Sequence, residues 1–118
     1  VDEPDGTPLE TLAHPQSRRV MSAENVALLR KMLQRVVEEG TAQDAAWLEE
    51  GAGGKTGTAQ TGQFTPDGTE RKNLWFAGFY PAQQPRYTIV VLQDGQVSTE
   101  HSSAAIFARL CAMLDLLA

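Results

Sequence analysis

The sequence predicts an α+β fold in which a three-stranded antiparallel sheet carries an N-terminal and a C-terminal amphipathic helix on one face. Two stretches with helical periodicity flank three stretches that are rich in β-branched and aromatic residues. The links between the three predicted strands are short, which favours antiparallel pairing. A chain of 118 residues is long enough for one domain, or for part of one.

The N-terminal helix is predicted to follow an irregular arm. Residues 1–19 contain prolines and a glycine among polar residues, so they are expected to form no regular structure. Ser22 is a suitable N-cap for the helix. Apolar residues then recur with helical spacing along one face, at Val26, Leu29, Leu33, Val36 and Val37. Gly40 is expected to follow the helix as its C′ residue.

The first strand is predicted to follow a glycine-rich segment. Residues 41–54 are expected to contain a helical turn and then a flexible approach with three glycines. A strand is predicted from residue 55 to about residue 64, because threonines and an aromatic residue suit a pleated surface. Residues 65–69, Thr-Pro-Asp-Gly-Thr, have the composition of a turn.

Two further strands and a helix complete the chain. Residues 74–80 and 87–93 are predicted strands, and residues 94–95 (Asp-Gly) are expected to end the second of them. Ser102 or Ser103 is expected to cap the C-terminal helix. The apolar stripe of this helix comprises Ile106, Phe107, Leu110, Cys111, Leu114 and Leu117. Because three strands are few, the sheet is expected to continue into chain beyond this sequence.

Composition excludes several classes of function. Ten basic against fifteen acidic residues give a net charge of −5, which argues against nucleic acid as a partner. The single cysteine, Cys111, excludes an internal disulfide and a multi-cysteine metal site, and its place on an apolar stripe predicts a core residue rather than a nucleophile. The sequence has no run of 18 apolar residues, so no membrane contact is expected from this segment.

The stretch Lys55-Thr56-Gly57-Thr58 carries the strongest chemical signal. A lysine supplies a compact positive charge, and threonine hydroxyls can bind a carboxylate. Gly57 leaves room for a ligand to approach the backbone, and a strand edge can pair with an extended peptide. The N–H of Thr58 could form half of an oxyanion hole. These groups suit a site that holds a peptide carboxylate while a nearby carbonyl is attacked.

Other interpretations of this stretch and of neighbouring residues are weaker. A phosphate-binding P-loop requires glycine at position 49, which is Glu49, and a strand before the motif and a helix after it. A second alternative is a glycine-rich turn that enters a strand and has no chemical role. His14 is expected to lie on the surface, and His101 is expected to lie near a helix cap. Trp47 and Trp75 are expected to pack in the core or under loops rather than to bind ligands. Taken alone, the stretch at residues 55–58 therefore allows a phosphate loop, a turn without a chemical role or an acyl-transfer strand, and its position between a helix and a strand favours the last of these.

The ordered motifs of residues 20–118 resemble the transpeptidase domain of class B penicillin-binding proteins. The Lys-Thr-Gly of residues 55–57 is similar to a known active-site motif of that family. The likeness extends to residues 40–42 (Gly-Thr-Ala), which precede the motif by about a dozen residues. Two further segments look like the next strands of the domain, at residues 75–81 and 86–91. Residues 102–118 look like its terminal helix.

The resemblance implies part of the β-lactamase/transpeptidase-like fold and a serine-type D,D-transpeptidase parent. Such enzymes cross-link peptidoglycan stem peptides and are acylated by β-lactams, without a metal or cofactor. Carried over, Lys55 would support proton transfer and attract the substrate carboxylate, and Thr56 and Thr58 would bind that carboxylate. The Thr58 N–H would complete the oxyanion hole, and Gly57 would let substrate lie against the strand. The family also implies an extracytoplasmic location on a membrane-anchored parent.

The sequence departs from the family because it lacks the nucleophile motif. None of its five serines has a lysine three residues later, and Ser-x-Asn is also absent. The chain is therefore expected to be the C-terminal part of a transpeptidase domain, and to have no catalytic activity alone. The alternative is a non-catalytic interaction module with this fold. An isolated segment of this kind is also expected to self-associate through an exposed sheet edge or apolar face.

Overall fold

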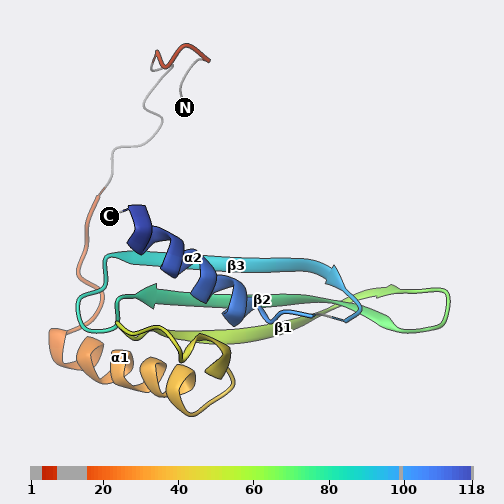
Figure 1. Cartoon of the computed structure of the whole chain (residues 1–118), viewed down its shortest axis with the longest axis horizontal. Helices are drawn as coiled ribbons and strands as arrows, with labels where there is room; N and C mark the ends of the chain where they lie inside the picture. The colour runs from red at the N-terminus through yellow and green to blue at the C-terminus, as the bar shows by residue number, and fades with distance from the viewer. Residues whose placement is uncertain (1–3, 8–15, 99, 118) are drawn as a thin grey trace.

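The computed structural model describes residues 4–7, 16–98 and 100–117. Within these ranges the chain forms one antiparallel sheet, with the strand order β1-β2-β3, and two α-helices. The elements are α1 (Ala23–Glu38), the 3₁₀ helix η1 (Gln43–Ala45), β1 (Gly53–Phe64), β2 (Glu70–Tyr80), β3 (Tyr87–Gln96) and α2 (Ser103–Leu117) (Figure 1). The predicted α+β class is confirmed, with three antiparallel strands that lie between two helices in the sequence.

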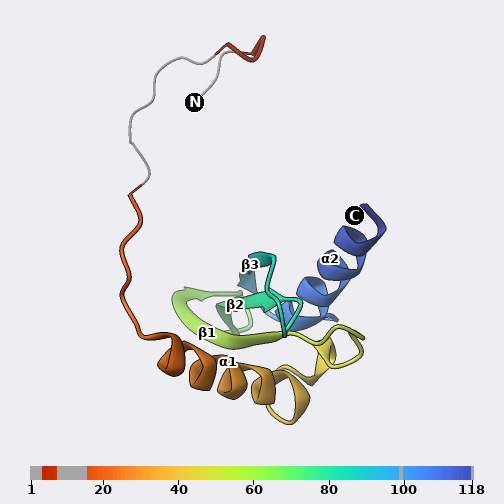
Figure 2. The same ribbon diagram turned by 90° about the vertical axis from the view of Figure 1, so that its left-hand side faces the viewer.

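The two helices contact different parts of the sheet. α2 lies across β2 and β3 on one face, while α1 runs along β1 (Figure 2). η1 contacts both helices and so connects them. The β1–β2 hairpin extends beyond the end of β3 and of α2 (Figure 1). None of the helices in the described ranges has the length and hydropathy needed to cross a bilayer.

The two helix starts follow the sequence pattern closely. Ser22 caps α1, because its side chain accepts a hydrogen bond from the N–H of Asn25 at 3.2 Å. Ser102 caps α2 in the same way, by accepting from the N–H of Ala105 at 3.0 Å. Of the predicted arm, residues 1–3 and 8–15, including His14, lie outside the described residues. Residues 4–7 and 16–22 contain no helix or strand before α1 begins.

The predicted apolar stripes are only partly buried. In α1, Val37 is buried and Val36 packs beside it, whereas Val26 and Leu29 are exposed because only the end of the stripe reaches the core. In α2, Phe107 and Cys111 face the sheet, but Leu117 is 82% exposed. Small residues take the sheet-facing positions that larger ones were expected to fill, because helical spacing aligns Ala104 and Ala108 with Phe107 and Cys111.

All three strands are longer than predicted, and β1 begins at Gly53 rather than at residue 55. β2 begins at Glu70 rather than at residue 74, and β3 passes through Asp94 and Gly95 instead of ending there. The register shifts at this point, and Gly95 has a φ of +60°, which is typical of a β-bulge. Arg71 donates to the Gly95 carbonyl at 3.2 Å, and the side chain of Asn73 accepts from the Gly95 N–H at 2.9 Å. Residues 94–95 therefore continue the strand pairing.

The core lies between the sheet and α2. The rings of Phe76 and Phe107 lie 4.7 Å apart between centroids, at an interplanar angle of 54°. Tyr80 and Val91 extend this cluster along β2 and β3. The Tyr80 hydroxyl donates to the carboxylate of Asp115 at the outer end of α2. This contact and the burial of the phenol raise the pKa of Tyr80, with burial as the larger cause.

The glycine-rich approach to β1 is packed rather than flexible. Gly53 and Gly54 are buried and already belong to the strand. A Cβ atom at Gly53 would lie 2.3 Å from the Phe79 ring, and one at Gly54 would lie 2.4 Å from the Phe76 ring. The expectation of a flexible segment is therefore wrong for these two residues, which are glycines because aromatic rings cover them.

We expect Gly78→Ala to destabilise the chain by about 2 kcal/mol, because overpacking distorts a filled core. A Cβ atom there would lie 2.5 Å from the Phe76 ring and 2.8 Å from the Gly53 carbonyl oxygen. Gly57→Ala is the matched control, since its Cβ would meet only the Cβ of Trp75, at 3.5 Å. Urea unfolding of the two variants measures the difference. Equal unfolding midpoints for both variants would contradict the packing argument.

Candidate functional site

The four residues of the predicted site lie in the first half of β1. Lys55, Gly57 and Thr58 are exposed, and Thr56 is half-buried. Lys55 pairs in register with Ala77 and Gly57 with Trp75, while Thr56 and Thr58 pair with Phe76 and Leu74. Since paired residues share a face, the two threonines start on the side of the sheet that α2 covers, and Lys55 starts on the other side.

The Lys55 side chain nevertheless reaches the edge of the sheet beside Thr56. Its Nζ donates to the Thr56 carbonyl at 2.8 Å and lies 3.5 Å from Thr56 Oγ1. Among the residues that the structure describes, the one ion pair joins Arg35 to Glu39. No described carboxylate therefore neutralises the ammonium group at the edge of β1.

The backbone of β1 presents hydrogen-bonding groups on its free edge, which is the edge that no described strand pairs with and along which α1 runs. The Gly53 carbonyl points toward β2, because a Cβ on Gly78 would lie 2.8 Å from it. In an antiparallel strand, the N–H and C=O of one residue point to the same side, and successive residues alternate. Thr56 and Thr58 consequently direct their backbone groups away from β2. The Thr58 N–H lies on the same edge as the Lys55 ammonium group, which is the arrangement that an extended anionic ligand requires.

Gly57 differs from the other glycines near the core. A Cβ at this position would make an ordinary contact with Trp75 Cβ at 3.5 Å, and its backbone φ is not positive. Neither packing nor backbone conformation within the chain requires glycine here. The absence of a side chain leaves the backbone accessible to a molecule outside the chain.

A small hollow lies beside the two threonines. It has a volume of about 130 Å³ and is bounded by β1, β2 and the first residues of α2. Ser103 donates to the Leu74 carbonyl at 3.0 Å and Gln93 donates to Ser103 at 2.9 Å, so β2, β3 and α2 are joined at its base. Ser102 donates to the carboxylate of Asp44, which ties the same helix end to η1. These contacts fix the start of α2 relative to β2, β3 and η1.

The sequence reasoning missed Thr41, which contacts the site directly. Its Oγ1 lies 2.9 Å from Oγ1 of Thr56, although fifteen positions separate the two residues. The available signal was a polar residue directly after Gly40, at the end of a helix that leads to the motif. Spacing alone could not show that the turn folds back onto β1.

Other candidate residues have structural positions. Cys111 is fully buried, and burial, followed by the charge of Asp115, raises the pKa of its thiol to about 12, so the thiol stays protonated at neutral pH. His101 precedes the cap of α2, and its carbonyl accepts from Gln93 at 3.2 Å. Trp47 and Trp75 are 57% and 40% exposed, so the expectation that they pack in the core or under loops is wrong.

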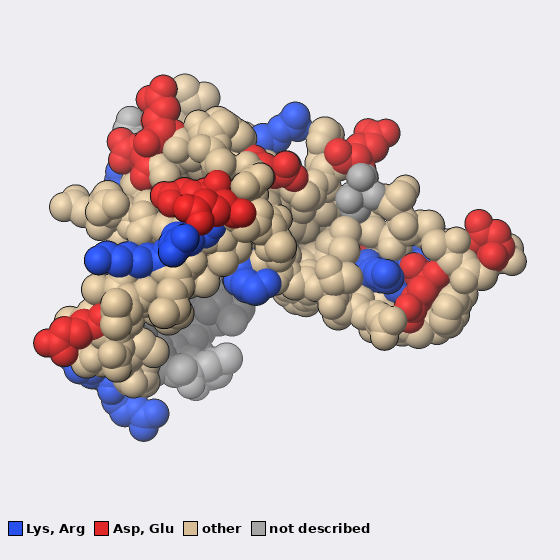
Figure 3. Space-filling view, turned by 90° about the horizontal axis from the view of Figure 1, so that it is seen from below, with Lys and Arg blue, Asp and Glu red and all other residues tan. Residues whose placement is uncertain are grey.

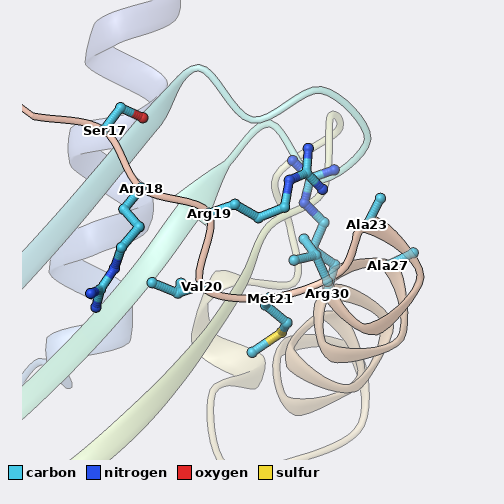
Figure 4. Close-up of a pocket in the computed structure, with 9 residues that line it drawn as sticks. Ser17, Arg18, Arg19, Val20, Met21, Ala23, Ala27 and Arg30 are labelled. Carbon is cyan, nitrogen blue, oxygen red and sulfur yellow. The ribbon is translucent and has the colours of Figure 1, made fainter.

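A larger hollow beside the start of α1 is separate from β1. It is lined by the exposed residues that precede the helix and by the first turns of the helix itself. In Figure 4, the side chains of Arg19 and Arg30 run toward the same part of this hollow, whereas Arg18 points elsewhere. On the face seen in Figure 3, Lys and Arg side chains are interspersed with Asp and Glu side chains and form no continuous basic surface. This face has no footprint for nucleic acid.

Comparison with known proteins identifies the family. The family model described as the penicillin binding protein transpeptidase domain matches residues 5–112. The chain belongs to the penicillin-binding protein transpeptidase family. Penicillin-binding protein PbpB of Mycolicibacterium smegmatis is 38% identical in an alignment 102 residues long, which covers 77% of this chain and 15% of that protein. Stage V sporulation protein D of Bacillus subtilis is 36% identical in an alignment 85 residues long, which covers 70% of this chain and 13% of that protein.

Solved penicillin-binding proteins contain the same arrangement of elements. Penicillin-binding protein 3 of Mycobacterium tuberculosis, solved with ampicillin, has a TM-score of 0.70 and 31% identity, over 98% of this chain and 28% of that one. Penicillin-binding protein A of Mycobacterium tuberculosis, solved as an imipenem acyl-enzyme, has a TM-score of 0.64 and 25% identity, over 99% and 25%. The chain thus spans a small part of the length of its relatives.

Proposed function

We propose that this chain is the C-terminal part of a D,D-transpeptidase domain and forms the wall of the active site that binds the substrate carboxylate. The observation that carries the proposal is the free edge of β1. There the Lys55 ammonium group, the Thr56 hydroxyl and the outward backbone groups of Thr58 lie beside a glycine that internal packing does not require. The ammonium group, the hydroxyl and the Thr58 N–H can each stabilise negative charge, and Gly57 gives access to them.

The residues have distinct roles in this proposal. Lys55 attracts the carboxylate of the peptide through its unpaired charge and supports proton transfer at the nucleophile. Thr56 and Thr58 donate hydrogen bonds to that carboxylate, and Gly57 lets the peptide lie against the backbone. When a serine attacks the substrate carbonyl, the carbonyl oxygen gains negative charge, and the Thr58 N–H stabilises it. The serine and its lysine partner belong to a Ser-x-x-Lys motif that this sequence lacks.

The proposed partners and location follow from the family. Relatives solved with ampicillin, or as an imipenem acyl-enzyme, support β-lactams as ligands of the complete domain. Peptidoglycan stem peptides are the proposed substrates, and the extracytoplasmic side of the cell membrane is the proposed location. We refer below to the longer protein that joins this chain to both absent motifs as the parent protein.

We expect this chain alone to form no covalent adduct with penicillin, because it contains no activated serine. Incubation with a labelled penicillin, followed by intact-mass analysis, measures acylation directly. The parent protein, treated in the same way, should gain one penicilloyl group. A stoichiometric adduct on the isolated chain would refute the assignment of the nucleophile to another part of the parent.

We also propose that the isolated chain self-associates through its uncovered sheet surface. On the face opposite α2, Trp75 pairs with Leu92 and Ala77 pairs with Val90. Val90 is 59% exposed and Leu92 is 45% exposed, so this apolar face lies open to solvent. Both outer strands, β1 and β3, also have a free edge.

Light scattering across micromolar concentrations should therefore show an average mass that rises with concentration. Leu92→Lys should lower that mass, because a charged side chain disfavours burial of the face. Gln84→Lys is the matched control, since Gln84 is exposed in the connection between β2 and β3, so the same charge is added away from this face. A single monomeric mass at every concentration would contradict the proposal.

A further inference from the structure

The turn between α1 and η1 holds Thr41 in a fixed position beside the site. The N–H groups of Gly40 and Ala42 both donate to the Val36 carbonyl, at 3.1 and 3.2 Å. Ala42 is fully buried, and a Cβ on Gly40 would lie 2.9 Å from the Val36 carbonyl oxygen. Thr41 is therefore anchored on both sides, and its hydroxyl is preorganised toward β1.

The hydrogen-bonding capacity of Thr56 gives the contact with Thr41 a specific consequence. A threonine hydroxyl has one hydrogen to donate and two lone pairs that accept. The Lys55 ammonium group, 3.5 Å from Thr56 Oγ1, can only donate. If Thr41 also donates across its 2.9 Å contact, both lone pairs of Thr56 Oγ1 face donors. The single hydrogen of Thr56 must then point away from both Thr41 and Lys55.

We propose that Thr41 is a positioning residue that donates to Thr56 Oγ1 and so keeps the Thr56 hydrogen available for the ligand carboxylate. The inference rests on the proposed function, in which Thr56 binds that carboxylate. Thr41 itself touches no ligand in this arrangement. The reverse direction, with Thr56 donating to Thr41, would use the only hydrogen that Thr56 can offer to an anion.

The test compares a penicillin with its methyl ester, because the ester lacks the negative charge that Thr56 is proposed to bind. Acylation rates are measured in the parent protein for wild type, Thr41→Val and Thr41→Ser. Thr41→Val keeps the side-chain shape and removes the hydroxyl, and Thr41→Ser keeps the hydroxyl. We expect Thr41→Val to slow the carboxylate probe by about tenfold, the loss of one hydrogen bond to a charged group, and to change the ester rate little. Thr41→Ser should restore the preference for the carboxylate.

Equal slowing of both probes by Thr41→Val would overturn the proposal, since a general distortion of β1 has no preference for charge. An unchanged ratio of the penicillin rate to the ester rate in Thr41→Val would overturn it too.

Thr56→Val separates this result from a failure of the proposed function. If Thr56→Val abolishes the preference while Thr41→Val does not, only the positioning role of Thr41 fails. If Thr56→Val leaves the preference intact, the carboxylate-binding role of Thr56 fails as well. Melting temperatures confirm that each variant is folded.

Discussion

The packing of Phe76 against Phe107 is the contact on which the site depends. It brings β2 against α2 so closely that Gly78 has no room for a Cβ atom, and the Phe76 ring likewise leaves no room for one at Gly54 in β1. Gly54 pairs with Gly78, so these two glycines let β1 and β2 pair in this register beside the ring. In an antiparallel strand the register decides which backbone groups face outward. In this register Thr56 and Thr58, rather than their neighbours, direct their backbone groups away from β2.

The glycines between residues 40 and 95 differ in what requires the absence of a side chain. Gly53 and Gly54 are covered by aromatic rings, and Gly40 lies against the end of α1. Gly95 adopts a positive φ in a bulge. Gly57 has none of these reasons. The contrast separates residues that the fold requires from Gly57, which the fold would tolerate as alanine and which we propose leaves room for a ligand.

Local patterns predicted the order and type of every main element, because capping serines, helical periodicity and β-rich stretches act over a few residues. They failed where distant side chains decide the outcome. Arg71 and Asn73 satisfy the backbone of Gly95, so β3 continues where an Asp-Gly pair suggested a stop. In the site, the motif at 55–58 was visible in the sequence. The contact between Thr41 and Thr56 was not, because the turn that creates it is held by backbone hydrogen bonds to the Val36 carbonyl and folds back onto a strand fifteen positions away.

The central claim is that the open edge of β1 serves a ligand rather than the fold, and Gly57→Ala in the parent protein tests it most directly. The measurement is the acylation rate with a labelled penicillin, together with the melting temperature of the same samples. The account predicts a rate at least about tenfold lower, because a methyl group blocks close approach to the strand, and an almost unchanged melting temperature. A normal acylation rate in a folded variant would contradict the claim.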